Sequence, residues 1–282
     1  MYTRYCRSML CTPAIADDRY TSCHRSGADV CLVDLEDSVP EPRKEEARRK
    51  AQAFFTGAPV RCAIRINALT EADGMRDLLA VRRYAVKPAI VLIPKVESHR
   101  DVEIVEHVLS PECPRVELLA VIETPRGLDR LDEIVAASPR LRAVIFGAAD
   151  YATALGTGLA WEPLSYARAK LVNAARAADI YAIDAPTFDL ADLALLRDEA
   201  IRAQVLGFSG KVALHPTHVP VLNDIFSPDA AQLEQARRIV VAGQRSGQGI
   251  TTVDGSMIGR PFFEASRRLL DEFRPDTHKT EA

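Results

Sequence analysis

Seven short apolar runs in this chain each end at a polar residue with a chemically useful side chain. The run at residues 32–33 precedes Glu36 and Asp37, and the run at residues 63–64 precedes Arg65. The other polar residues that follow such runs are Asn67, Lys95, Glu123, Asp150, Asp184 and His215. Strands that end in this way and alternate with helices are typical of an α/β barrel with its active site on one face.

Segments rich in β-branched residues alternate with segments of helical periodicity along the chain, which is the pattern of repeated βα units. About eight units can be counted, so we predict a single TIM (β/α)8 barrel with a C-terminal helical extension and lid. The predicted strands cover residues 7–14, 30–37, 61–67, 89–95, 116–124, 141–150, 181–186 and 211–215.

The length of 282 residues, with 48% hydrophobic content, suits one such barrel with modest additions. We predict a catalytic barrel over residues 1–226 and an extension over residues 227–282. Two helices of the extension flank a glycine-rich segment at residues 246–255. We interpret this segment as a flexible lid, or as an arm that reaches a neighbouring subunit, and the alternative is an ordinary surface extension.

The net charge of −3 comes from interspersed acidic and basic residues, which argues against nucleic acid as a partner. No apolar stretch approaches the roughly 20 residues that span a bilayer, and the first residues lack the apolar core of a signal peptide. We therefore expect no membrane association and a cytoplasmic location. The six cysteines form no Cys-x-x-Cys pair, so reduced and mostly buried thiols are favoured over zinc ligands or disulfides.

Glu123 and Asp150 are the first candidates for chemistry because they follow consecutive predicted strands. Their carboxylates could converge on one hard divalent cation, and two oxygen ligands completed by water suit Mg²⁺. Such an ion could polarise a substrate carboxylate or enolate oxygen. The alternative is that one of the two residues caps a helix or forms a salt bridge in a loop.

Arg65 closes a predicted strand, where a buried guanidinium is costly unless it meets an anion. Its planar fork suits a carboxylate or a developing enolate, and a structural ion pair with Glu36 or Asp37 is the alternative. Glu36 and Asp37 could orient metal-bound water or Arg65, or cap the next helix. Lys95 could be a Schiff-base nucleophile, but nearby carboxylates favour a charged ion-pair partner.

Several motifs occur together and in order along the chain. They are RSMLCTP at 7–13, DLEDSV at 34–39, RIN at 65–67, IPKVES at 93–98, IETP at 122–125, FGAADY at 146–151, GFSGK at 207–211, HP at 215–216 and DGSMI at 254–258. Together they resemble the citrate lyase beta-subunit family, which includes malyl-CoA and citramalyl-CoA lyases. The resemblance covers most of the chain.

This resemblance implies a magnesium-dependent barrel of the phosphoenolpyruvate/pyruvate superfamily that makes or breaks a carbon–carbon bond beside a carboxylate. It implies that Glu123 and Asp150 bind Mg²⁺ and that Arg65 holds a 2-oxo acid and stabilises enolate charge. Glu36 and Asp37 would support them. The predicted substrate-binding residues are Arg65, Asn67, Lys95 and Pro125. The family also implies a homo-oligomer, a trimer or hexamer, in which a C-terminal segment closes over a neighbouring site.

Two departures from the family pattern affect this interpretation. Many relatives read Met-Ile-Asp-x-Pro in the lid, and that aspartate is a candidate to transfer a proton to or from the thioester enolate. This chain has Gly259 in its place, so the role would pass to Asp254, Glu264 or a partner residue. Ser22-Cys23-His24 also stands where the family often has a lysine, so the thioester carrier could be recognised differently.

We therefore expect a Mg²⁺-dependent lyase that cleaves or forms a β-hydroxy acid of the malyl-CoA, citramalyl-CoA or citryl-thioester type through a metal-bound 2-oxo acid or enolate. The first alternative is an aldolase that acts on free 2-oxo acids and aldehydes without a CoA carrier. The second is a non-catalytic barrel subunit, against which the intact Arg65, Glu123 and Asp150 argue.

Overall fold

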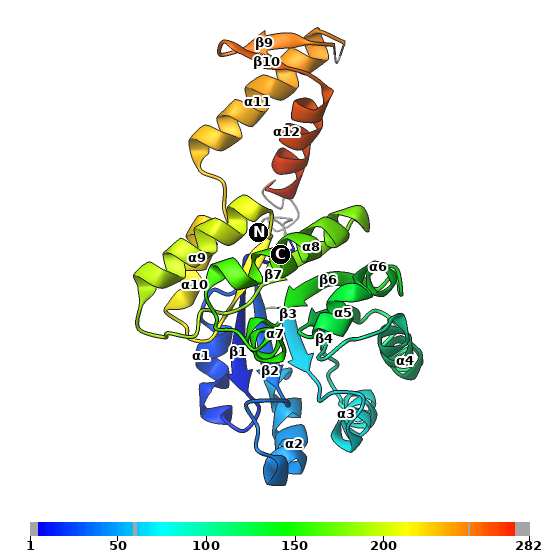
Figure 1. Cartoon of the computed structure of the whole chain (residues 1–282). Helices are drawn as coiled ribbons and strands as arrows, with labels where there is room; N and C mark the ends of the chain where they lie inside the picture. The colour runs from blue at the N-terminus through cyan, green and yellow to red at the C-terminus, as the bar shows by residue number, and fades with distance from the viewer. Residues whose placement is uncertain (1–4, 59–60, 248, 274–282) are drawn as a thin grey trace. The chain divides into compact units, whose positions relative to one another are not determined.

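The computed structural model describes residues 5–58, 61–247 and 249–273. The chain divides into two compact units, of which the first is Cys6–Phe226. The second contains the helices and strands that follow Ser227 (Figure 1). No helix among the described residues is long and apolar enough to cross a membrane.

The first unit is a closed barrel of eight parallel strands in sequential order, which confirms the predicted TIM barrel. Pairing of Met9 with Val212 closes it between the first and last strands. The strands are short and almost wholly buried because both faces are covered, one by the barrel interior and one by helices. They are β1 (Ser8–Pro13), β2 (Val30–Asp34), β3 (Arg61–Arg65), β4 (Ile90–Ile93), β5 (Glu117–Ile122), β6 (Leu141–Phe146), β7 (Tyr181–Asp184) and β8 (Gly210–Ala213).

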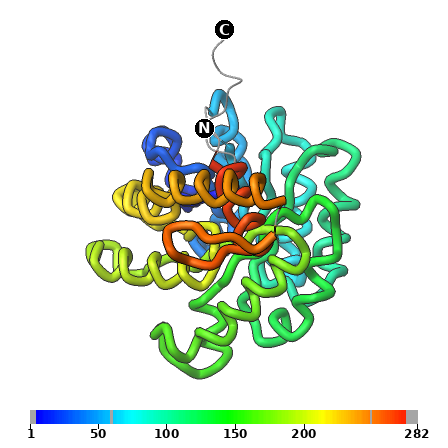
Figure 2. Tube along the Cα trace, turned by 90° about the horizontal axis from the view of Figure 1, so that it is seen from above, coloured from blue at the N-terminus to red at the C-terminus, as the bar shows by residue number. Residues whose placement is uncertain are grey.

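Helices follow the strands and lie around the barrel (Figure 2). They begin with recognisable caps: Ser98 accepts a hydrogen bond from the Arg100 N–H while Asp101 accepts one from the Ser98 N–H. The helices of this unit are η1 (Asp17–Arg19), α1 (Tyr20–His24), η2 (Glu41–Arg43), α2 (Lys44–Phe54), α3 (Ala72–Arg83), α4 (His99–Leu109), α5 (Pro125–Asp129), α6 (Leu131–Val135), α7 (Ala148–Leu155), α8 (Trp161–Ala177), α9 (Leu193–Leu206) and α10 (His218–Ile225).

Several strands end earlier than predicted, and two of these ends matter for function. The predicted strand at 30–37 stops at Asp34, whose carboxylate accepts hydrogen bonds from the backbone N–H groups of Glu36 and Ser38. These local bonds replace the strand ladder with a turn. The predicted strand at 141–150 stops at Phe146, so Asp150 lies in the first turn of α7. A carboxylate is favoured there by the helix dipole.

The second unit consists of α11 (Ala230–Arg245), β9 (Thr251–Val253), β10 (Ser256–Ile258) and α12 (Arg260–Glu272). The predicted glycine-rich lid segment overlaps an antiparallel hairpin, and its role as a lid or arm stays a prediction. Asp254 and Gly255 form its two-residue turn with φ of 50° and 81°, and positive φ at both positions is what a type I′ turn requires. Ile239, Ile258 and Phe263 form a small core in this unit.

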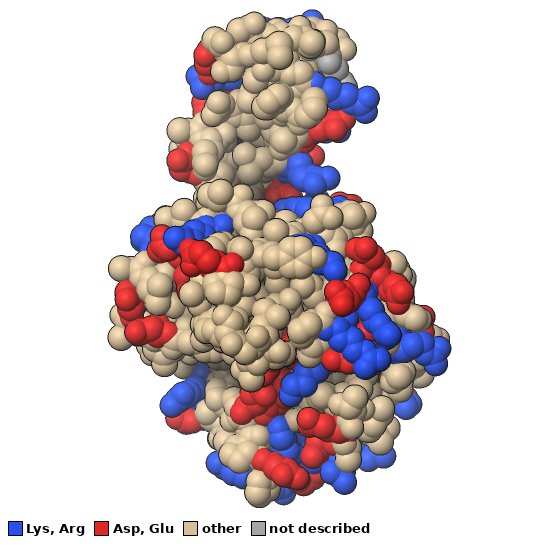
Figure 3. All heavy atoms as spheres, viewed as in Figure 1, with Lys and Arg blue, Asp and Glu red and all other residues tan. Residues whose placement is uncertain are grey.

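The surface carries mixed charge. On the face shown in Figure 3, lysine and arginine side chains lie among aspartates and glutamates. No disulfide joins the six cysteines, all of which lie in the described ranges, and five of them are buried. No group of three or more metal-ligating side chains gathers anywhere in the described ranges.

Candidate active site

A cavity of about 340 Å³ lies in the barrel unit and reaches the carboxyl ends of its strands. The structure brings Arg65, Glu123 and Asp150 together in its wall, where they meet Asp34 and Asp37. The remaining wall is largely apolar and is formed by Cys11, Leu32, Leu92, Val121, Ile145, Phe146, Pro186, Phe188, Val212 and Leu214, with Ser38 and residues 147–149. The cavity therefore has one charged region and a hydrocarbon wall.

Arg65 is held mainly by Asp34, a residue that the sequence analysis did not single out. The Arg65 Nε and Nη2 donate to Oδ1 and Oδ2 of Asp34 at 2.6 and 2.7 Å, a bidentate pair at the last positions of β2 and β3. Burial would raise the pKa of Asp34, but the charge and hydrogen bonds of Arg65 outweigh it and lower the pKa. The alternation along β2, which puts Leu32 and Asp34 on one face, is the signal that could have found this residue.

The predicted ion pairs of Arg65 with Glu36 and Asp37 are also present. The Arg65 Nη1 lies 3.0 Å from Glu36 Oε2 and 3.3 Å from Asp37 Oδ2. Glu36 also lies 3.0 Å from Lys95 Nζ, so its buried carboxylate has a cation on each side. Neither oxygen is aligned for a hydrogen bond. Burial raises the pKa of Glu36 to about 7 despite these cations.

Lys95 contacts two of the acidic residues at the site, Glu36 and Glu123. Its backbone N–H donates to Oε1 of Glu123 at 2.6 Å, and its ammonium faces Glu36. The backbone at Lys95 is left-handed, with φ of 50°, which is uncommon outside glycine. Burial opposes the ammonium charge, but the ion-pair contact with the Glu36 carboxylate raises the pKa of Lys95. A charged ion-pair partner therefore fits Lys95 better than a Schiff-base amine.

Glu123 is buried at the end of β5 beside Asp150 on α7. Burial, with the negative charges of Glu36 and Asp150, raises the pKa of Glu123 to about 8. Its Oε2 accepts no hydrogen bond from the described residues, which leaves this oxygen for another ligand. Two carboxylates in one cavity, with water or substrate in the other positions, form the kind of oxygen site that Mg²⁺ accepts.

Gly147 makes room for the Glu123 carboxylate. A Cβ at this position would lie 2.3 Å from the Glu123 Cβ and 2.5 Å from its Oε2. We expect Gly147→Ala to lower the free energy of unfolding by about 1–3 kcal/mol through overpacking. Gly158→Ala is the matched control, since nothing lies within 4 Å of a Cβ there. Equal urea midpoints for the two variants would show that Gly147 is not a steric requirement.

The other predicted binding residues have different surroundings. Asn67 is buried, and its side-chain amide donates a hydrogen bond to Asp77 and accepts one from Lys44. Pro125 begins α5 behind Thr124, which caps that helix. Among the described residues, neither Asn67 nor Pro125 lines the cavity, so contact with substrate stays a prediction for both.

Two further strand-end residues have structural partners. Asp184 accepts hydrogen bonds from Arg168 and Lys211, at 2.9 and 2.8 Å, in a buried ion-pair cluster. The Nδ1 of His215 lies 2.7 Å from the Thr217 hydroxyl. Neither of these strand-end residues lines the cavity in the part of the chain that the structure describes.

The sequence is similar to those of known proteins. Residues 7–216 match the model of the HpcH/HpaI aldolase/citrate lyase family. The chain is 34% identical to citrate lyase subunit beta of Escherichia coli K12, covering 95% of this chain and 93% of that one. It is 32% identical to the L-malyl-CoA/beta-methylmalyl-CoA lyase of Rhodobacter capsulatus, covering 83% and 84%.

The chain is also similar in sequence and fold to proteins of solved structure. RipC from Yersinia pestis is 39% identical, with a TM-score of 0.73 over 82% of this chain and 99% of that one. Protein CitE from Mycobacterium tuberculosis, solved in complex with magnesium, acetoacetate and coenzyme A, is 31% identical, with a TM-score of 0.79 over 94% and 97%.

The barrel and its named relatives define the class of the protein as a carbon–carbon lyase. More specifically, the chain belongs to the HpcH/HpaI aldolase/citrate lyase family. This membership confirms the family predicted from the ordered motifs.

Proposed function

We propose that this protein is a Mg²⁺-dependent lyase that cleaves or forms a β-hydroxy acyl-CoA thioester, with a small 2-oxo acid as one product or substrate. One observation carries the proposal: Glu123, Asp150 and Arg65 face the same cavity. The relatives named as citrate lyase beta subunit and malyl-CoA lyase support this reaction class.

Glu123 and Asp150 are the residues that would hold Mg²⁺. The fit rests on their acceptor-only oxygens, on the unpaired Oε2 of Glu123 and on the space that Gly147 leaves beside it. When bound, the ion supplies Lewis-acid polarisation of a carbonyl or carboxylate oxygen. The solved complex of the Mycobacterium tuberculosis protein with magnesium supports the choice of metal.

Arg65 has the charge and the fixed orientation needed to stabilise a negative oxygen on the oxo acid or enolate. Asp34 holds one edge of the guanidinium, and Glu36 and Asp37 face its Nη1. This arrangement fixes the side chain before substrate binds, so little reorganisation is needed in the transition state. Such a pre-positioned donor contributes about 3–4 kcal/mol in comparable sites.

The proposal also specifies that the substrate is linked to coenzyme A as a thioester. The Mycobacterium tuberculosis complex contains coenzyme A, and the apolar wall of the cavity suits an acyl group. An aldolase on free 2-oxo acids is the second candidate, favoured by Gly259. Both acidic residues that could replace the missing aspartate already form ion pairs, Asp254 with Arg238 and Glu264 with Arg260.

One assay separates these candidates. Malyl-CoA and citramalyl-CoA should be cleaved in the presence of Mg²⁺, and EDTA should stop the reaction. Turnover only of free hydroxy-oxo acids would favour the aldolase. Magnesium binding without turnover of any of these substrates, together with a stable complex with another protein, would indicate a non-catalytic barrel subunit.

Magnesium affinity is expected to depend on pH. The ion must replace the proton on Glu123, whose pKa is raised to about 8, so affinity should increase as pH rises and level off above that value. Between about pH 9 and about pH 6 the dissociation constant should rise roughly a hundredfold, measured by calorimetry. A dissociation constant that stays level across this range would exclude a protonated Glu123 as the metal ligand.

We include a cytoplasmic homo-oligomer, a trimer or hexamer, in the proposal. The family resemblance supports it. Sedimentation analysis of the purified protein tests it, and a monomer at all concentrations would contradict it.

A further inference from the structure

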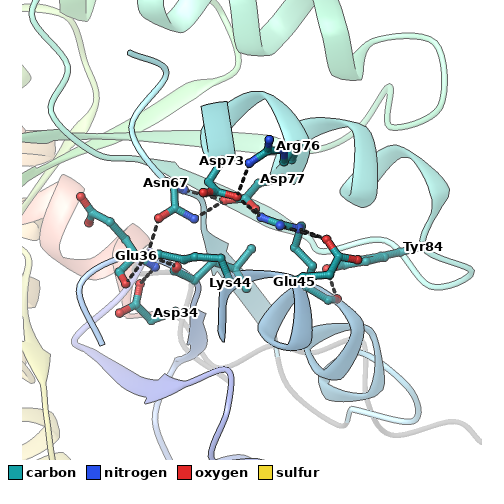
Figure 4. Close-up of polar contacts among 11 residues, drawn as sticks. Asp34, Glu36, Lys44, Glu45, Asn67, Asp73, Arg76, Asp77 and Tyr84 are labelled. Atoms are coloured by element: carbon teal, nitrogen blue, oxygen red, sulfur yellow. Dashed lines mark hydrogen bonds and ion pairs between the residues drawn. The ribbon is translucent and has the colours of Figure 1, made fainter. Parts of the chain in front are cut away.

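A largely buried polar chain contacts the backbone of Glu36, whose carboxylate pairs with Arg65 in the cavity wall. We call it the Lys44 relay, and its members are Lys44, Asn67, Asp77 and Arg48 (Figure 4). It joins the start of α2 to the end of β3 and to α3. Asn67, Asp77 and Arg48 are buried, yet none of the four lines the cavity in the described part of the chain.

The Lys44 ammonium is fully engaged by the protein. Its Nζ donates to the carbonyl oxygens of Leu35 and Glu36 at 2.8 and 2.7 Å, and to Oδ1 of Asn67 at 2.5 Å. An ammonium has three donors, so none is left for a substrate. Lys44 therefore binds the backbone of Leu35 and Glu36, just after the end of β2.

The rest of the relay fixes the direction of Lys44. Asp77 Oδ2 accepts from both the backbone N–H and the Nδ2 of Asn67, at 2.7 and 2.6 Å, so the Asn67 oxygen faces Lys44. Arg48 Nη1 donates to the other Asp77 oxygen at 3.0 Å. Arg48 in turn forms ion pairs with Asp73 and Glu45.

Glu36 is consequently held at both of its peptide groups. Its N–H donates to Asp34 Oδ1 at 3.0 Å, and its carbonyl accepts from the Lys44 Nζ at 2.7 Å and from the Val39 N–H at 3.0 Å. Its carboxylate has ion-pair contacts with Arg65 and Lys95 but no aligned hydrogen bond of its own. The backbone contacts and the two ion pairs together set the position of that carboxylate.

We propose that Lys44 is a positioning residue for the active centre: it fixes the Glu36 backbone so that the Glu36 carboxylate stays between Arg65 and Lys95. The effect on ligand binding rests on the proposed function, because Arg65 is the group expected to meet the oxo acid. The effect on the position of the Glu36 carboxylate does not rest on the proposed function.

The test compares Lys44→Met with Lys50→Met, a control on the same helix whose ammonium pairs with Asp17 and Glu46 at the surface. In crystal structures, Lys44→Met should displace the Glu36 carboxylate from one or both cations, and Lys50→Met should not. With Mg²⁺ present, pyruvate should bind Lys44→Met roughly tenfold more weakly than wild type and bind Lys50→Met within about twofold. An unmoved Glu36 carboxylate in Lys44→Met would overturn the proposal.

A double-mutant cycle separates positioning from general stability. In a Glu36→Gln background, Lys44→Met should change pyruvate affinity by less than about twofold, because Lys44 acts through Glu36. An equal loss in both backgrounds would contradict the proposal. If Lys44→Met does not fold, Lys44→Arg takes its place. Arginine keeps the positive charge, but its planar guanidinium cannot donate the same three converging hydrogen bonds. The position of the Glu36 carboxylate in the Lys44→Arg crystal structure is then the quantity to compare with wild type. If wild type binds no oxo acid, the proposed function fails, and the crystal structures still decide the role of Lys44.

Discussion

Replacing Glu123 with glutamine is expected to lower magnesium-dependent turnover at least roughly a hundredfold, since a metal contributes several kcal/mol of transition-state stabilisation. The fold should survive. Glutamine has the same shape, and its oxygen can still accept the Lys95 N–H. Burial opposes the Glu123 charge, so the neutral side chain should make the metal-free protein more stable as pH rises above the ordinary pKa of 4.5, with the full gain reached above about pH 8. Steady-state kinetics and thermal unfolding measure the two effects.

Asp150→Asn should have the same effect on turnover because its carboxylate lines the same cavity. Asp129→Asn is the control, since Asp129 is exposed on α5 and its nearest cation is Lys170 at 3.8 Å. Full activity of Glu123→Gln or Asp150→Asn in EDTA would contradict the metal assignment. Loss of activity together with loss of folding would point to a structural role instead.

Arg65→Met is expected to affect both stability and activity. It leaves the Asp34 carboxylate buried without its bidentate partner, and breaking a buried pair in this way costs about 3–5 kcal/mol. Turnover should fall roughly a hundredfold to a thousandfold with the loss of a donor aimed at developing negative charge. Urea unfolding measures the loss of stability, and steady-state kinetics measure the loss of turnover.

A second substitution separates the two effects of Arg65. Asp34→Asn combined with Arg65→Met removes the uncompensated charge, so most of the lost stability should return. Activity should not return, because the guanidinium is still absent. Recovery of turnover in the double variant would show that Arg65 serves the fold alone.

The barrel could be predicted because apolar runs and helical periodicity are local properties of the chain. Strand ends were less well predicted. Asp34 ends β2 through hydrogen bonds to its own turn, and β6 ends at Phe146 so that α7 begins at Ala148, before Asp150. The Asp-Gly pair at 254–255 is a hairpin signal from which the β9–β10 pairing could have been predicted.

The roles of buried polar residues could not be predicted from spacing. Asn67 follows a strand as a substrate-binding residue would, but its partners Lys44 and Asp77 come from α2 and α3. Only the packing of those helices brings the three side chains together. By contrast, the topology of a barrel places Arg65 and Glu123 on one face, and α7 brings Asp150 to the same cavity; the chemical roles of the three residues stay a prediction.

A crystal of the wild-type protein soaked with Mg²⁺ and pyruvate tests the central claim most directly. We predict an ion about 2.0–2.1 Å from one oxygen of Glu123 and one of Asp150, with pyruvate on the ion and in contact with Arg65. An ion bound elsewhere, or pyruvate bound away from these three residues, would contradict the account.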